Sequence, residues 1–123
     1  GTLPGTDSPG AGKFASLANA AGFKAGPYAP QSYDAAALMI MAMQAAGTSD
    51  STKFKDKVMT VANAPGEKIY PGELSKALKI IASGGDVDYV GATDIELIGP
   101  GESAGSFQEI VIKDQKITPV RYR

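Results

Sequence analysis

The stretch Ser32-Tyr-Asp-Ala-Ala-Ala-Leu-Met-Ile-Met-Ala-Met-Gln-Ala-Ala-Gly47 has more influence on the fold than any other part of the chain. Alanine, leucine and methionine are strong helix formers, so we predict a helix here. Ser32 is the predicted N-cap, and Asp34 lies in the first turn, where a negative charge suits the helix dipole. Gly47 is the predicted C-terminal stop. Because the run 35–43 is apolar on nearly every side, we expect most of its surface to be buried beneath a sheet or another lobe.

Three further helices are predicted outside this stretch, from capping residues and from apolar side chains at helical spacing. Serine before proline, aspartate or serine before a polar turn, and proline followed by glutamate are all typical helix starts. Pairs of glycines and single glycines mark the ends. These signals predict helices from about 9 to 21 with Ser8 as N-cap, from Asp50 or Ser51 to near Asn63, and from Pro71 and Glu73 to Gly84-Gly85.

Outside the predicted helices, the sequence predicts loop and connector segments near the start of the chain and strands near its end. Residues 1–10 are rich in glycine, proline, serine and threonine and are expected to be loop, and residues 26–31 read as an extended connector. Three strands are expected at 95–98, 106–112 and 117–122, the last two joined as a hairpin across Asp114-Gln115. Pro119 confines the final strand to a sheet edge or limits its length. The predicted class is α/β, with four helices followed by a short strand and a C-terminal β-hairpin.

The composition excludes several kinds of function. The chain has no cysteine and no histidine. Catalysis by Cys–His or Ser–His–Asp groups and zinc sites built on these residues are therefore excluded within this chain. A formal net charge of −1 gives no basic surface for nucleic acid and no polybasic run for an anionic membrane. We predict no catalytic residue, no metal site and no cofactor.

Three local patterns could suggest a phosphate or metal site, but the sequence favours a structural explanation for each. The segment Gly5–Lys13 lacks the spacing of a phosphate-binding loop, because Asp7 stands where the first glycine is required and Phe14 follows the lysine. Alternating methionines at 39, 41 and 43 predict packing and not a metal site. The acidic residues of the C-terminal half lack calcium-loop spacing, so solvated loop carboxylates are favoured over a cation site. Those residues are Asp86, Asp88, Asp94, Glu96 and Glu102.

Two tyrosines flank the connector that precedes the apolar helix. Tyr28 and Tyr33 lie on either side of Pro30. An aromatic side chain beside a connector could line a ligand cleft, and it could equally pack at a helix start. The residues alone leave both interpretations open.

The order of several motifs resembles the C-terminal portion of type I periplasmic solute-binding proteins of ABC transporters, of the branched-chain amino acid and amide-binding family. The resemblance rests on Pro27-Tyr-Ala-Pro-Gln-Ser-Tyr-Asp-Ala-Ala-Ala-Leu38, on Ala45-Ala-Gly-Thr-Ser-Asp50, on Pro71-Gly-Glu-Leu-Ser-Lys-Ala-Leu78 and on Gly84-Gly-Asp-Val-Asp-Tyr-Val-Gly-Ala-Thr93. The turn at Gly101-Glu102 and the last strand pair continue it. Asp94, where the family commonly has glycine, and Ile98-Gly99, where it often has Phe-Asp, depart from the pattern.

The resemblance implies a two-lobe α/β fold that closes on a small solute, such as a branched-chain amino acid or amide. It places residues 1–27 at the end of the distal lobe, 28–92 in the lobe that holds the N-terminus, and 93–123 in a third crossing and the C-terminal strands. It implies Tyr28 and Thr2 as ligand-binding residues. It also implies a periplasmic location and delivery of the solute to an ABC permease in the membrane.

Two other functions remain open beside solute binding for transport. One is a ligand-sensing ectodomain of the same fold, and the other, less favoured, is a small stand-alone enzyme. The chain shows no start methionine, signal peptide or transmembrane run, and we expect a processed or trimmed product. We also expect the isolated chain to be an incomplete fragment that hides apolar surface by self-association.

Overall fold

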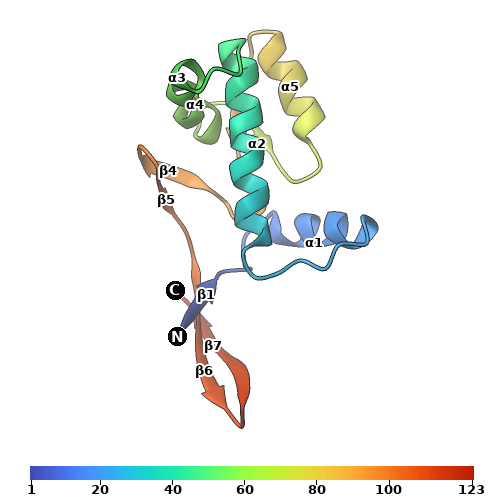
Figure 1. Ribbon diagram of the computed structural model, residues 1–123, viewed down its shortest axis with the longest axis vertical. Coiled ribbons are helices and arrows are strands. Elements are labelled where there is room, and N and C mark those ends of the chain that lie inside the picture. The colour runs from blue at the N-terminus through green and yellow to red at the C-terminus, as the bar shows by residue number, and fades with distance from the viewer.

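The computed structural model describes residues 1–123 and shows a mixed α/β chain (Figure 1). A body of helices contains a parallel strand pair, and an antiparallel arm extends away from it. In chain order the elements are β1 (Thr2–Pro4), α1 (Ala11–Ala20), α2 (Ala29–Ala46), α3 (Ser51–Phe54), the 3-10 turn η1 (Lys55–Lys57), α4 (Val58–Ala62), β2 (Glu67–Ile69), α5 (Leu74–Ala82), β3 (Val87–Tyr89), β4 (Glu96–Gly99), β5 (Glu102–Ala104), β6 (Phe107–Lys113) and β7 (Lys116–Tyr122).

Helix α2 is the central element of the body, and it is buried on one side only. Leu38 and Met41 join the main apolar core, against α4, α5 and β3. Met39 and Ile40 on the same helix are 46% and 42% exposed. The prediction that this helix is buried over most of its surface is therefore wrong for this chain, because α3 to α5 cover one face and nothing covers the other.

The helix starts differ from two of the predicted caps. Helix α2 begins at Ala29, with Pro30 in its first turn, so Ser32 lies inside the helix and donates to the backbone oxygen of Tyr28. Ser8 does not cap α1, whose N-cap is Gly10, and instead donates to the backbone oxygen of Ala92. The α2 start lies about one turn before the expected place and the α1 start two residues after it, and in both cases the serine has another partner. The predicted stop at Gly47 is confirmed by its left-handed backbone.

A parallel strand pair in the body was not predicted. Strands β2 and β3 pair in register from Glu67 opposite Val87 to Ile69 opposite Tyr89, with α5 as the connection between them. Each strand has only three residues, and β3 includes Asp88, whose carboxylate the sequence places in a solvated loop. Together with β1 and β5, this pair also corrects the predicted order, since strands occur before, between and after the helices.

The expected third helix is divided into α3, η1 and α4, although its predicted start is confirmed. The side chain of Asp50 accepts from the backbone N–H of Thr52 at 3.0 Å. After α4, the amide of Asn63 donates to the Leu97 oxygen at 2.8 Å and accepts from the Leu97 N–H at 2.9 Å. These two bonds attach strand β4 to the body, and β4 then pairs with β5.

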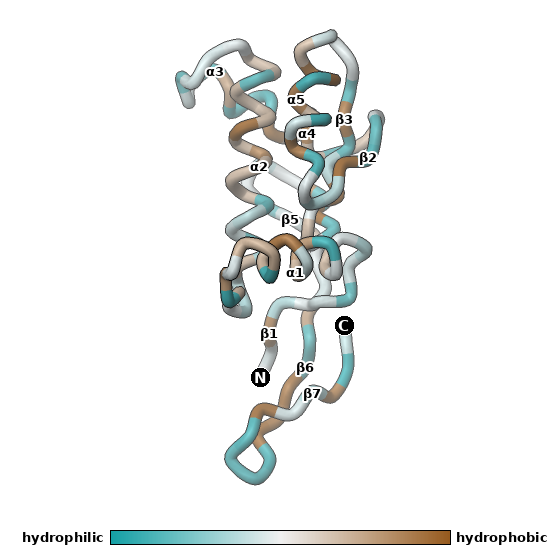
Figure 2. The backbone as a smooth tube through the Cα atoms, turned by 90° about the vertical axis from the view of Figure 1, so that its right-hand side faces the viewer, coloured by the Kyte–Doolittle hydropathy of each residue, from teal (hydrophilic) through white to brown (hydrophobic).

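The arm is a three-stranded antiparallel sheet in the order β1-β6-β7. Strand β1 lies in the segment 1–10 that was expected to be loop, and Thr2 stands opposite Glu109. The hairpin across Asp114-Gln115 is confirmed, and β7 with Pro119 is an edge strand as predicted. Figure 1 shows both chain ends beside each other on this arm, and Figure 2 shows alternating apolar and polar stretches along it with a hydrophilic tip. No helix of the chain has both the length and the apolar character needed to cross a lipid bilayer.

Candidate functional site

The junction between body and arm is formed by segments that are far apart in the sequence. The Gly5 N–H donates to the Ser106 oxygen at 2.9 Å, and the Ser106 hydroxyl donates to Asp7. Thr6 and Tyr122 are joined through their hydroxyls at 2.9 Å. The start of the chain, the segment after β5 and the last strand therefore meet at one place, beside the loop that follows β3.

Helix α1 lies across the base of α2 and contacts that same loop. Gly10, at its start, approaches the backbone oxygen of Gly91 so closely that a Cβ at position 10 would overlap it. Phe14 packs its ring against Tyr33, with the ring centroids 5.4 Å apart. In this structure α1 therefore packs on the body, and β1 belongs to the arm.

Asp34 fixes the loop after β3 to helix α2. Its side chain is fully buried and accepts four hydrogen bonds, from the Tyr89 hydroxyl at 2.9 Å, the Ala92 N–H at 2.8 Å, the Thr93 N–H at 2.9 Å and the Thr93 hydroxyl at 2.6 Å. A carboxylate can satisfy four donors in this way, so the buried charge is well solvated by the protein. The predicted first-turn role of Asp34 is wrong, because the helix starts earlier than expected and turns this residue inward.

Burial has a clear effect on the partner of Asp34. The pKa of Tyr89 is raised above its usual value, first because the ring is buried and second because Asp34 lies beside its hydroxyl. Gly91, between these groups, has φ +63, and a Cβ there would overlap the Asp34 carboxylate. The loop from Val90 to Asp94 is thus held in one conformation, with Thr93 directed towards the junction.

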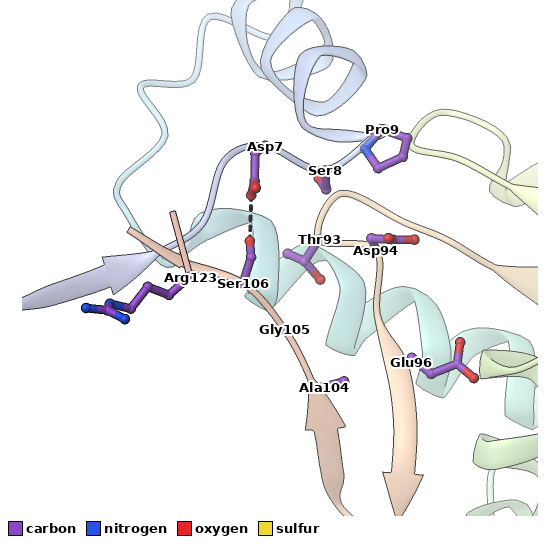
Figure 3. Close-up of a pocket in the computed structure, with 10 residues that line it drawn as sticks. All are labelled: Asp7, Ser8, Pro9, Thr93, Asp94, Glu96, Ala104, Gly105, Ser106 and Arg123. Carbon is purple, nitrogen blue, oxygen red and sulfur yellow. Dashed lines mark hydrogen bonds between the residues drawn. The ribbon is translucent and has the colours of Figure 1, made fainter. Parts of the chain in front are cut away.

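A polar cavity of about 420 Å³ opens at the junction (Figure 3). Asp7, Ser8, Thr93, Asp94, Glu96 and Ser106 contribute its polar groups. Arg123 also borders it, but Figure 3 shows the guanidinium turned away from Asp94 and Glu96. Arg123 instead pairs with Glu109 at 2.9 Å. Two of the acidic residues interpreted as solvated loop carboxylates, Asp94 and Glu96, therefore border a cavity.

A second cavity of about 230 Å³ shares Thr93 and the segment 104–106 with the first. Tyr28 and Gln31 line it from the start of α2, and Phe107 lines it from the arm. Its lining contains hydroxyl, amide and aromatic groups but no charged side chain. The Gln31 Oε1 atom is buried and has no hydrogen-bond partner, the only such side-chain atom in the chain.

A third concave surface also includes Tyr28 in its lining. It is an apolar groove of about 800 Å³ between α1 and the connector, lined by Phe14, Leu17, Phe23, Tyr28 and Tyr33 among others. Tyr28 thus lines both a polar cavity and an apolar groove, and it is 60% exposed. Tyr33 packs on Phe14, and its hydroxyl accepts from the Gly72 N–H at 3.0 Å, so its contacts are those of a packing residue.

The structure separates the two residues that the resemblance implied as ligand contacts. Tyr28 lines the smaller polar cavity and the apolar groove, and Thr2 lies in β1 on the arm, outside the lining of the three described above. Sequence reasoning missed Gln31, Thr93 and the role of Asp34. The position of Gln31 three residues after Tyr28 was a usable signal, because residues three apart share one helix face.

On the arm, one acidic side chain pairs with two arginines. Glu109 accepts from Arg121 at 2.8 Å and from Arg123 at 2.9 Å. These two guanidinium groups lower the pKa of Glu109 to about 2, with hydrogen bonding to Arg121 as the largest cause. No cluster of three or more acidic, histidine or cysteine side chains is arranged to hold a metal ion.

No known protein family, curated protein or solved structure matches this chain.

Proposed function

We propose that this chain is part of the substrate-binding component of an ABC transporter, which captures a small solute such as a branched-chain amino acid or amide. In this proposal the solute binds in the polar cavities at the junction of body and arm, and no covalent chemistry takes place. The periplasmic location and the membrane permease as partner belong to the same proposal and rest on the sequence resemblance.

The observation that carries the proposal is the position of Tyr28. Tyr28 lines both the uncharged polar cavity and the apolar groove. A branched-chain amide or amino acid has one polar end and one apolar end, and an aromatic wall between two such environments suits it. The segments that form the cavity also connect body and arm, so a bound solute would contact both.

The geometry of the parallel strand pair gives additional support. The loop 90–94 follows β3, and it supplies Thr93 to both polar cavities. In α/β proteins, ligands bind beyond the carboxyl ends of parallel strands. The four hydrogen bonds to Asp34 hold this loop in place, so its polar groups are already positioned before a solute arrives.

Titration calorimetry on the full gene-encoded protein tests this proposal, with leucine, isoleucine, valine and their amides as probes. The Tyr28→Ala variant is expected to bind the best of these about 1–3 kcal/mol more weakly than the wild type, the loss typical of one aromatic contact. The matched control is Ile112→Ala, which removes an apolar side chain that is 78% exposed on the arm. Absence of binding to every probe, or equal affinity in Tyr28→Ala and wild type, would contradict the proposal.

A further inference from the structure

The side-chain amide of Gln31 lacks a hydrogen bond that its oxygen could accept. Its Oε1 atom is buried without a hydrogen-bond partner. Leaving a buried acceptor unsatisfied is costly, so such a group needs an explanation, and a bound solute is one. Every other buried side-chain oxygen or nitrogen in the chain has a partner, including all of the Asp34 cluster.

The position of Gln31 indicates what its side-chain amide could bind. The residue lies in the first turn of α2, three residues after Tyr28, and it lines the cavity of about 230 Å³ between α2 and the arm. Because the oxygen has no exposed surface, the Gln31 side chain must turn for its amide to meet a solute in that cavity. Thr93 and Ser106 line the same cavity; their hydroxyl hydrogens are donated to Asp34 and Asp7, so their oxygens are available to it as acceptors.

We propose that Gln31 is a ligand-contacting residue that selects a solute with a neutral hydrogen-bonding group, a primary amide above all. This inference rests on the proposed solute-binding function and adds its specificity. A primary amide carries a donor and an acceptor side by side, as the side chain of Gln31 does, so the two groups pair without leaving either atom unsatisfied.

The charge distribution disfavours a carboxylate in this cavity. No charged side chain lines it, and Arg123, which borders the neighbouring cavity, is paired with Glu109. Burying a carboxylate without a cation is far more costly than burying a neutral amide. The solute group beside Gln31 is therefore uncharged.

The test is calorimetry on the full gene-encoded protein with a matched pair of probes, isobutyramide and isobutyrate. The wild type is expected to bind the amide at least tenfold more tightly than the carboxylate. Gln31→Leu is expected to weaken amide binding at least tenfold and to leave the thermal midpoint unchanged or higher, because the variant removes an unsatisfied buried acceptor. A residue with a merely structural role would lower the midpoint as well.

The matched control is Gln44→Leu, an exposed glutamine on the same helix, about 20 Å away at 1.5 Å rise per residue. It is expected to bind both probes as the wild type does. Amide binding that Gln31→Leu leaves unchanged overturns the role of Gln31 and leaves the proposed function intact. A carboxylate bound as tightly as the amide overturns the selectivity. If neither these two probes nor the amino acids and amides bind, the proposed function fails and this inference fails with it.

Discussion

Asp34 shows how one side chain organises the candidate site. Four donors from β3 and its following loop converge on a carboxylate that has no exposed surface. Thr93, which borders both polar cavities, uses two of those bonds. The conformation of the site is therefore set from within the body, by a residue that lines none of the three junction cavities.

Replacing Asp34 should destabilise the fold in a graded way. Asp34→Ala leaves several buried donors without an acceptor, and each unsatisfied donor costs about 1–3 kcal/mol. We therefore expect the free energy of unfolding to fall by about 3 kcal/mol or more. Asp34→Asn keeps one acceptor oxygen but turns an NH₂ group towards N–H donors, and we expect a smaller loss. Urea unfolding followed by circular dichroism measures both variants.

The control for this series is Asp56→Ala, since Asp56 is exposed in the short η1 turn. Its effect should stay within about 0.5 kcal/mol, as for ordinary surface substitutions. Equal losses in Asp34→Ala and Asp56→Ala would show that the buried hydrogen bonds do not contribute to stability as the geometry indicates.

Residue-level prediction from the sequence succeeded where the signal was local. Gly47 and Asp50 act at the helix ends as their backbone and side-chain chemistry requires. Asp34 could not be placed in the same way, because its partners lie 55 to 59 residues away. The unsatisfied Gln31 oxygen is equally a product of long-range packing and has no counterpart in the sequence pattern.

At the scale of elements, strand length decided what could be recognised. The hairpin β6-β7 has seven residues on each side and a two-residue turn, and it was predicted. Strands β1, β2, β3 and β5 have three residues each, too few to show an alternating pattern, and they were missed. Their existence depends on partners supplied by the fold: β6 pairs with β1, and β2 and β3 pair with each other across α5.

The turn of the hairpin offers a stabilising substitution. Asp114 and Gln115 both have positive φ, at 50° and 60°. A left-handed conformation costs about 1–2 kcal/mol for a residue with a Cβ, whereas glycine adopts it freely at an entropy cost of about 0.5–1 kcal/mol. We therefore expect Gln115→Gly to stabilise the hairpin by about 0.5–1 kcal/mol, which slows amide exchange in β6 and β7 by about two- to fivefold.

Hydrogen exchange read by NMR is the appropriate measurement for that variant, because the arm can open without unfolding the body. Gln115→Ala is the matched control, since it removes the same polar group but keeps the Cβ. Faster exchange in Gln115→Gly than in wild type, or equal gains in the glycine and alanine variants, would contradict the assignment of strain to this turn.

At the scale of the whole molecule, the chain exposes more surface than a compact domain of its mass. Its accessible surface is 7518 Å², and only 20 of its 123 residues are buried. A folded monomer of 12.6 kDa is expected to expose about 6,200 Å². The excess has two visible sources, the uncovered face of α2 and an arm that projects from the body with both faces in contact with solvent.

We therefore expect the 123-residue chain to self-associate at micromolar to millimolar concentrations. The arm carries large exposed apolar side chains on adjacent strands, with Ile112 at 78%, Ile117 at 61% and Val120 at 52% exposure, and its edge strand β7 leaves backbone groups unpaired. Sedimentation velocity across a concentration series should show species heavier than a monomer.

The double variant Ile112→Lys with Ile117→Lys should shift the distribution towards the monomer, because it places charge on the paired positions of β6 and β7 while leaving the body untouched. The matched control, Met39→Lys with Ile40→Lys, alters the open face of α2 instead. A wild-type chain that sediments as a monomer at every concentration would show that the excess surface is tolerated in water. Loss of association in the α2 variant alone would move the contact from the arm to the helix.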